Sequence, residues 1–357
     1  MAEIKFIILW TIFCFLDCCN GSCEATNSSS LPKFSALLFF GDSLLDTGNN
    51  NYIKTVLNAN YAPYGQDYPG NVPTGRFSNG KLIPDMLGSI LASKEAVPPY
   101  LDPKVSDSDI VSGVNFASAG SGYDDSTALL TNVIPFSRQI ELFKEYIERL
   151  KGIIGEVKAK EIINGSLVFI SSGTNDLILN YYDIPTRRLE FTVSDYQDFL
   201  LDRLQKFVKE FYDLGCRSIV VCGIVPIGSL PLQMVIGRLV SPFSFEDQNR
   251  DIQLYNQKLT NLLPQLQATL PGTKFVYYDI YETALDLVNH PEKYGFTETK
   301  KACCGNRPGN LLILCDPLTP PCEDASKFLF WDTIHPTLTG YQFLFKDIVE
   351  NVLPQFL

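Results

Sequence analysis

Five short, largely apolar runs alternate along the chain with longer stretches in which apolar residues recur every three or four positions. The runs occupy residues 36–40, 110–117, 166–172, 218–224 and 274–280, and none of them alternates strictly between apolar and polar residues. Apolar runs without alternation are typical of strands buried on both faces. They predict a parallel sheet covered by helices on both sides.

The intervening stretches supply the helices. Helical spacing of apolar residues predicts helices over 81–93, 136–152, 194–215 and 246–269, and a last helix after Pro336. Ser194 is the expected N-cap of the third helix and Gly215 its end. Strand–helix alternation without an internal linker indicates one α/β domain, in which ligands bind at the carboxyl ends of the strands.

The first 25 residues have a different character. Lys5 precedes a short apolar stretch at 6–16, and Cys23 and Ala25 place small residues at both key positions of a cleavage site. The stretch is too short to span a bilayer comfortably. We expect a secretory signal peptide at 1–25, a single domain at 26–357, secretion to the extracellular space and no stable membrane span; an uncut N-terminal anchor is the alternative.

Charge narrows the choice of partners. The formal net charge is −11 and the pI is near 4.8, and no basic stripe interrupts the acidic sequence. Nucleic acids and anionic membrane surfaces attract basic proteins. We therefore expect neither as a partner.

Four cysteines lie close together near the C-terminus, in "ACCGNRPGNLLILCDPLTPPC". Clustered cysteines in an exported chain suggest disulfides, and a bond between the neighbours Cys303 and Cys304 would be strained, so either residue pairs with Cys315 or Cys322. The paired spacing of zinc ligands is missing, and we expect no metal. Cys216 and Cys222 are too far apart in an extended run to bond each other.

Two Asn-x-Ser triplets are candidate glycosylation sites, at Asn27 and Asn164. Such triplets also occur by chance, so their use depends on export and exposure. Both stay open at this point.

The segment "GDSLLDTG" begins where the first apolar run ends. Ser43 is therefore either a turn residue or a nucleophile at a strand end. A serine nucleophile needs a base, and the chain has two histidines. His335 follows Asp332 by three residues, a spacing that lets the carboxylate reach Nδ1 on a tight loop; His290 has no carboxylate at that spacing, and we expect it on the surface.

An ester-hydrolysing serine also needs donors for the oxyanion. The Ser43 N–H, a backbone N–H at Gly120 and the side-chain amide of Asn175 are the candidates, since Gly120 and Asn175 follow the second and third runs. Each residue alone is ordinary turn chemistry. Together with Asp332 and His335, they favour a serine hydrolase.

Four blocks, "FFGDSLLDTGNN", "GVNFASAGSGYDD", "SSGTNDL" and "FWDTIHPT", resemble the plant-type GDSL esterases/lipases of the SGNH hydrolase superfamily, and the likeness runs from about residue 35 to the C-terminus. The resemblance implies a three-layer α/β/α, flavodoxin-like sandwich with five parallel strands. It implies Ser43 as nucleophile, His335 as base, Asp332 as its partner, Ser43, Gly120 and Asn175 as the oxyanion hole, and no metal or organic cofactor. Ala119 departs from the family's usual double glycine.

The substrate is less sharply indicated. We expect a secreted esterase or lipase that acts on carboxylic esters, with lipid-like acyl esters favoured. Aromatic residues within 49–80 either line an acyl pocket or serve ordinary loop packing, and both interpretations stay open. A sugar O-acetylesterase of the cell wall, an acyltransferase and a silent binding protein are the alternatives. The Gly-x-Ser-x-Gly elbow of α/β-hydrolases does not surround Ser43.

Overall fold

The computed structural model describes residues 31–234, 242–305, 314–315, 318 and 320–357. Residues 32–357 form one compact unit. The predicted signal peptide and Asn27 lie outside the described residues. Within the described part, we find no helix with the length and apolar character needed to cross a bilayer.

A four-stranded parallel sheet lies at the centre of this unit. Its strands are β1 (Leu37–Gly41), β2 (Leu167–Ser171), β3 (Ser218–Cys222) and β4 (Lys274–Tyr278), in the order β1-β2-β3-β4. Nearly every residue in these strands is buried, as the apolar runs predict. Four of the five expected strands are confirmed.

The fifth run, 110–117, does not form a regular strand. Its first residues belong to α2 (Asp107–Ser112), because Ser106 and Asp109 form a capping box that starts a helix there. The chain then extends beside β1, where the Phe116 N–H donates to the Phe39 carbonyl at 2.8 Å, and a single bridge joins Asn115 to Phe39. The expected count of five strands is therefore wrong by one, although an extended segment occupies the fifth place.

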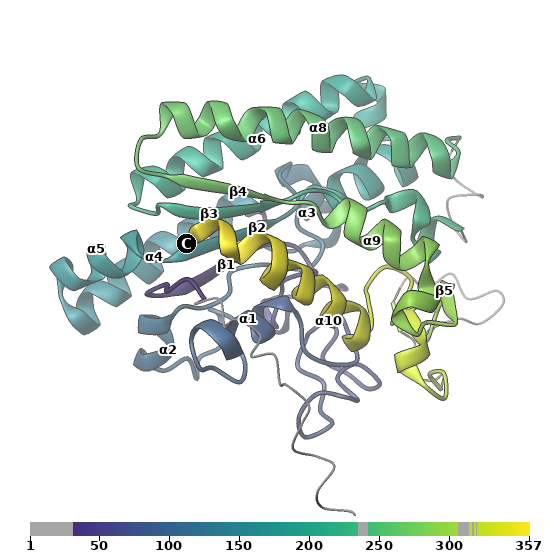
Figure 1. Ribbon diagram of the computed structural model, residues 1–357, viewed down its shortest axis with the longest axis horizontal. Helices are drawn as coiled ribbons and strands as arrows, with labels where there is room; N and C mark the ends of the chain where they lie inside the picture. Colours follow the sequence, from purple (N-terminus) through teal and green to yellow (C-terminus); the bar gives the residue numbers. More distant parts are fainter. Residues whose placement is uncertain (1–30, 235–241, 306–313, 316–317, 319) are drawn as a thin grey trace, which may run out of the picture. The chain divides into compact units, whose positions relative to one another are not determined.

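Helices cover both faces of the sheet, so the three-layer architecture is confirmed. In Figure 1, α6 (Val193–Asp213) and α8 (Phe245–Thr269) lie above the sheet, and α1 (Ile83–Leu91) and α10 (Leu338–Asp347) lie below it. Phe40 of β1 packs against Phe143 of α4 (Phe136–Ile154) and Phe211 of α6, so these two helices share a face.

The third predicted helix begins earlier than expected. The N-cap of α6 is Thr192, whose hydroxyl accepts the Asp195 N–H, so the expectation for Ser194 is wrong. Thr192 has the extended backbone conformation of an N-cap, whereas Ser194 already lies within the first turn of the helix.

The remaining regular elements are short. They are α3 (Asp125–Thr131), α5 (Glu156–Asn164), α9 (Ile280–Asn289), β5 (Glu298–Ala302), β6 (Phe328–Phe330), the 3₁₀ turns Asn49–Tyr52, Arg187–Leu189, Ile227–Ser229, Pro291–Tyr294, Ala325–Lys327 and Leu353–Phe356, and π-helical turns at Asp176–Asp183 and Ile348–Val352. β5 and β6 pair in parallel as a separate two-stranded sheet.

Disulfides lie next to that small sheet. Cys303 bonds Cys322 and Cys304 bonds Cys315, which is one of the two pairings that the sequence leaves open. Cys216 and Cys222 are buried and free, as their separation predicts.

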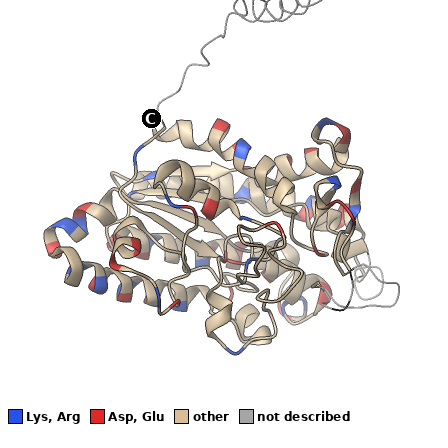
Figure 2. Cartoon of the chain, turned by 90° about the horizontal axis from the view of Figure 1, so that it is seen from below, with Lys and Arg blue, Asp and Glu red and all other residues tan. Residues whose placement is uncertain are grey.

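Charged residues are mixed on the surface. Figure 2 shows basic and acidic positions interspersed along the helices, and several of them pair one turn apart, such as Lys160 with Glu156 and Lys209 with Asp213. The expectation that nucleic acid is not a partner stays a prediction.

Candidate active site

The end of β1 is shaped so that Ser43 leaves the sheet in a sharp turn. Gly41 has φ +132°, and a Cβ there would lie 1.7 Å from the Ser171 carbonyl oxygen of β2, so only glycine fits. The side chain of Gln139, from α4, binds both main-chain groups of Gly41. These contacts hold the backbone two residues before Ser43.

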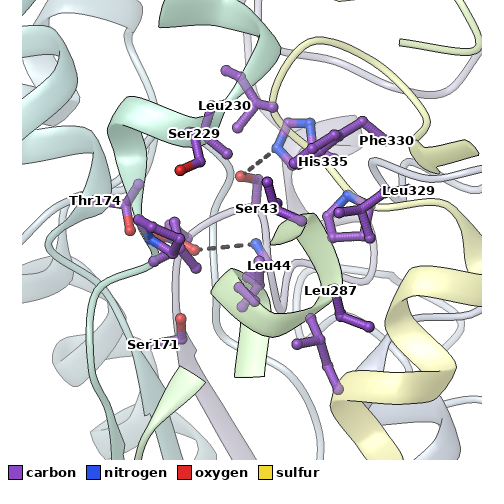
Figure 3. Close-up of a pocket in the computed structure, with 18 of the residues that line it drawn as sticks. Ser43, Leu44, Ser171, Thr174, Ser229, Leu230, Leu287, Leu329, Phe330 and His335 are labelled. Carbon is purple, nitrogen blue, oxygen red and sulfur yellow. Dashed lines mark hydrogen bonds between the residues drawn. The ribbon is translucent and has the colours of Figure 1, made fainter. Parts of the chain in front are cut away.

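Ser43, His335 and Asp332 form a continuous hydrogen-bonded chain. The Nε2 atom of His335 lies 2.7 Å from Ser43 Oγ, and its Nδ1 lies 2.8 Å from each carboxylate oxygen of Asp332. Figure 3 shows the imidazole pointing at the hydroxyl. All three residues are buried, Asp332 completely. The arrangement can activate a serine hydroxyl.

A tight loop fixes the orientation of Asp332. Its Oδ1 accepts the N–H groups of Ile334 at 2.9 Å and His335 at 2.8 Å, and the Trp331 N–H donates to the His335 carbonyl at 2.7 Å. The Asp332 carboxylate therefore contacts the imidazole three residues later, as expected, because hydrogen bonds within residues 331–335 form a tight loop.

Two aromatic residues from a distant loop complete this cluster. The Tyr64 hydroxyl donates to Asp332 Oδ2 at 2.6 Å, and the Phe77 ring lies 5.0 Å from the imidazole, centre to centre. None of the aromatic residues of 49–80 is among the residues that line the cavity next to Ser43, so loop packing is the better of the two interpretations for them. The sequence gives no signal for the Tyr64–Asp332 contact.

The expected oxyanion donors differ in their placement. Asn175 lines the cavity next to Ser43, and its amide donates one hydrogen to the Ser121 carbonyl at 2.9 Å, leaving the second hydrogen. Within the described part of the chain, the backbone N–H groups of Ser43 and Gly120 donate to no protein acceptor. Gly120 has φ +85° and is buried, but it is not among the residues that line the cavity.

The cavity next to Ser43 is mainly apolar. It lies at the carboxyl ends of β2 and β3 and extends between α9, β6 and α10 (Figure 3). Its apolar lining residues are Leu44, Val225, Pro226, Leu230, Ala284, Leu287, Val288, Leu329, Phe330, Ile334, Pro336 and Leu344. This lining suits apolar groups, and the cavity volume of about 60 Å³ has room for a short acyl group.

Buried carboxyl groups surround the site. Burial raises the pKa of Asp42 to about 7, that of Asp46 to about 6 and that of Asp176 to about 8. Asp46 accepts the N–H groups of Gly48, Asn49 and Ala119, so it ties the loop after β1 to the segment that contains Gly120.

The other candidate residues lie elsewhere. His290 is on the surface, as expected, but it pairs with Asp286, four residues earlier, at 2.5 Å; sequence reasoning considered only the three-residue spacing. Asn164 is exposed at the end of α5, and its glycosylation stays a prediction.

Comparisons with known proteins agree on one family. The model of the GDSL-like lipases/acylhydrolases matches residues 37–348. Two GDSL esterase/lipases of Arabidopsis thaliana are each 53% identical to the chain, covering 90% of it and 91% of their own length. A third is 50% identical over 94% of this chain and 92% of its own.

Proposed function

The chain belongs to the family of GDSL-like lipases/acylhydrolases, and on that premise we propose that it hydrolyses carboxylic esters through an acyl-enzyme on Ser43. Carboxylic ester hydrolysis follows from the family. The observation that carries the mechanism is the chain of contacts from Ser43 Oγ through His335 to Asp332.

The proposed reaction has two steps. His335 Nε2 takes the proton of Ser43 as Oγ attacks the ester carbonyl, and the same nitrogen then protonates the leaving alcohol. Water activated by His335 next attacks the acyl-enzyme and releases the acid. Asp332 holds Nδ1 protonated, so that Nε2 is free to accept.

The oxyanion of each tetrahedral intermediate would be held by backbone and amide donors. The Ser43 and Gly120 N–H groups have no protein acceptor among the described residues, and Asn175 has a second amide hydrogen available. An oxyanion hole requires available donors close to the nucleophile. Ser43 and Asn175 line the cavity, whereas Gly120 does not.

For the substrate, the lining of the cavity favours an acyl chain over a sugar acetate. Leucine, valine and phenylalanine side chains from five different segments contribute apolar surface, whereas an acetyl group needs little of it. We therefore place lipid-like acyl esters ahead of acetylated polysaccharides, with the first few carbons of the acyl chain in the cavity.

The decisive experiment is labelling with a fluorophosphonate probe. The folded protein should gain one adduct, and peptide mapping should locate it on Ser43. Ser43→Ala should abolish both labelling and ester turnover while circular dichroism stays unchanged. An unlabelled Ser43 in folded protein, with no turnover of p-nitrophenyl esters of any chain length, would point to a silent binding protein instead.

We also propose export with removal of residues 1–25. The basis is the sequence of that segment together with the two disulfides, which are typical of oxidising compartments. N-terminal sequencing of the protein recovered from culture medium should begin at Thr26; an intact N-terminus would contradict the cleavage.

A further inference from the structure

Tyr64 makes a contact that the two-step reaction does not use. Its hydroxyl lies 2.6 Å from Asp332 Oδ2, although 268 residues separate them in the sequence, and both side chains are almost completely buried. We propose that Tyr64 is a positioning residue, which fixes Asp332 in the orientation that His335 needs. The proposal rests on the proposed function for its kinetic meaning.

The direction of the Tyr64 hydroxyl hydrogen is set by a second contact. The hydroxyl oxygen accepts the Cys315 N–H at 3.2 Å. Because that neighbour is a donor, the phenolic hydrogen points to the carboxylate. Burial and the neighbouring Asp332 raise the pKa of Tyr64 well above its ordinary value, so the hydrogen stays on the oxygen at working pH.

The contact completes the hydrogen bonding of Asp332. Oδ1 accepts two backbone N–H groups as well as His335 Nδ1, whereas the partners of Oδ2 among the described residues are Nδ1 and the Tyr64 hydroxyl. Without Tyr64, one oxygen of a fully buried carboxylate depends on the imidazole alone. Charge would then concentrate on that oxygen, and the carboxylate could turn about its bond to Cβ.

Tyr64 is itself held by its surroundings. Its ring contacts Tyr61 and Phe77 edge to face, at 5.4 and 5.8 Å between centres. The Cys315 backbone is fixed by the bond to Cys304, whose N–H donates to the Trp331 carbonyl next to Asp332. The Tyr64 hydroxyl is therefore fixed from two sides, by the backbone of the disulfide-bonded Cys315 and by Asp332.

Tyr61 provides a matched control. Its hydroxyl donates to the Cys315 carbonyl at 2.8 Å, so both tyrosines bind the main chain of the same cysteine, but only Tyr64 contacts Asp332. Tyr64→Phe and Tyr61→Phe each remove one hydroxyl from this cluster. A difference between the two variants therefore reports the contact with Asp332.

The first readout is the pH dependence of ester hydrolysis, with active enzyme counted by fluorophosphonate titration. In Tyr64→Phe we expect kcat to fall about tenfold with KM nearly unchanged, since a hydrogen bond to a charged group is lost. A carboxylate with one donor fewer favours protonated His335 more strongly, so the acid limb of kcat/KM should move to higher pH. Tyr61→Phe should leave both properties unchanged.

The second readout does not depend on turnover. The chain has two histidines, so the Nδ1 proton of His335 can be assigned by NMR in protein labelled with ¹⁵N-histidine. Its resonance should move in Tyr64→Phe and stay in place in Tyr61→Phe. If wild-type protein proved inactive, the proposed function would fail while this measurement still tested the placement of Tyr64.

Several results would overturn the proposal. The proposal fails if the acid limb of kcat/KM and the Nδ1 proton resonance both stay at their wild-type positions in Tyr64→Phe. If activity falls in that variant while neither moves, the hydroxyl contributes only to folding. If Tyr64→Phe does not fold, 3-fluorotyrosine at position 64 keeps the hydroxyl and makes it a stronger donor. The acid limb should then move to lower pH, and an unmoved limb would contradict the proposal.

Discussion

Gln139 binds the peptide groups on both sides of Gly41: its Oε1 accepts the Gly41 N–H and its Nε2 donates to the Gly41 carbonyl, each at 2.8 Å. The glutamine is fully buried and comes from α4, 98 residues further along the chain. Together with the Ser118 N–H, which donates to the same Gly41 carbonyl at 2.9 Å, it fixes the end of β1 and so supports the turn that presents Ser43.

Gln139→Ala should therefore destabilise the protein strongly. The buried Gly41 N–H loses its acceptor, whereas the Gly41 carbonyl keeps the Ser118 N–H at 2.9 Å, so the free energy of unfolding should fall by about 1–3 kcal/mol. Urea unfolding measures the change. Gln265→Ala, an exposed glutamine on α8, is the control and should change stability by less than about 0.5 kcal/mol. Equal losses in the two variants would contradict the role of Gln139.

Asn175→Ala should slow the chemical step. If the amide stabilises the oxyanion only in the transition state, kcat should fall about 10²- to 10³-fold while KM stays close to the wild-type value. Steady-state kinetics on a p-nitrophenyl ester separate the two constants. A rise in KM with normal kcat would show that Asn175 binds substrate rather than the transition state.

Leu287→Trp should shift the preference for chain length. Leu287 lines the cavity from α9, and a larger side chain there leaves less room for an acyl chain. We expect kcat/KM for p-nitrophenyl octanoate to fall at least about tenfold relative to acetate, which corresponds to the loss of two or more buried methylenes. Leu285→Trp, on the same helix but outside the lining, should leave the ratio unchanged; a matching shift there would reject the assignment of the cavity.

The disulfide pairing can be tested by counting thiols. In Cys303→Ser the newly alkylated residue should be Cys322, and in Cys304→Ser it should be Cys315. Alkylation of the unreduced, denatured variants followed by mass spectrometry identifies the freed cysteine. The reverse assignment would establish the other pairing that the sequence allows.

Stability should decrease as the pH rises from about 4 to about 8. Asp42, Asp46 and Asp176 have folded-state pKa values of about 7, 6 and 8, above the ordinary value near 4, so the native state holds protons that the unfolded chain has released. The stabilisation is complete below pH 4 and is lost as each folded-state pKa is passed. Urea unfolding at pH 5 and pH 8 checks the sign, and Asp42→Asn should reduce the difference.

Local features of the sequence predict much of the fold. Continuous apolar runs locate β1, β2, β3 and β4, since strands buried on both faces carry apolar residues at successive positions. Residues 110–117 mislead because the capping box at Ser106 and Asp109 competes with their apolar character. The pattern of apolar residues therefore predicts the positions of four strands. At the fifth position, helix capping replaces the start of the expected strand.

The site divides in a similar way. The three-residue spacing of Asp332 and His335 is readable because both lie on one loop. Gln139 and Tyr64 are not readable, because each acts on a residue about 100 or more positions away and its local context resembles any helix or loop. The lining of the cavity by α9 likewise depends on packing between helices that no single segment specifies.

The distance of 292 residues along the chain between Ser43 and His335 has a consequence for biosynthesis. A ribosome that has delivered the serine must add almost the whole remaining polypeptide before the imidazole exists. Until the C-terminal segment has folded against β1, the nascent chain cannot attack an ester.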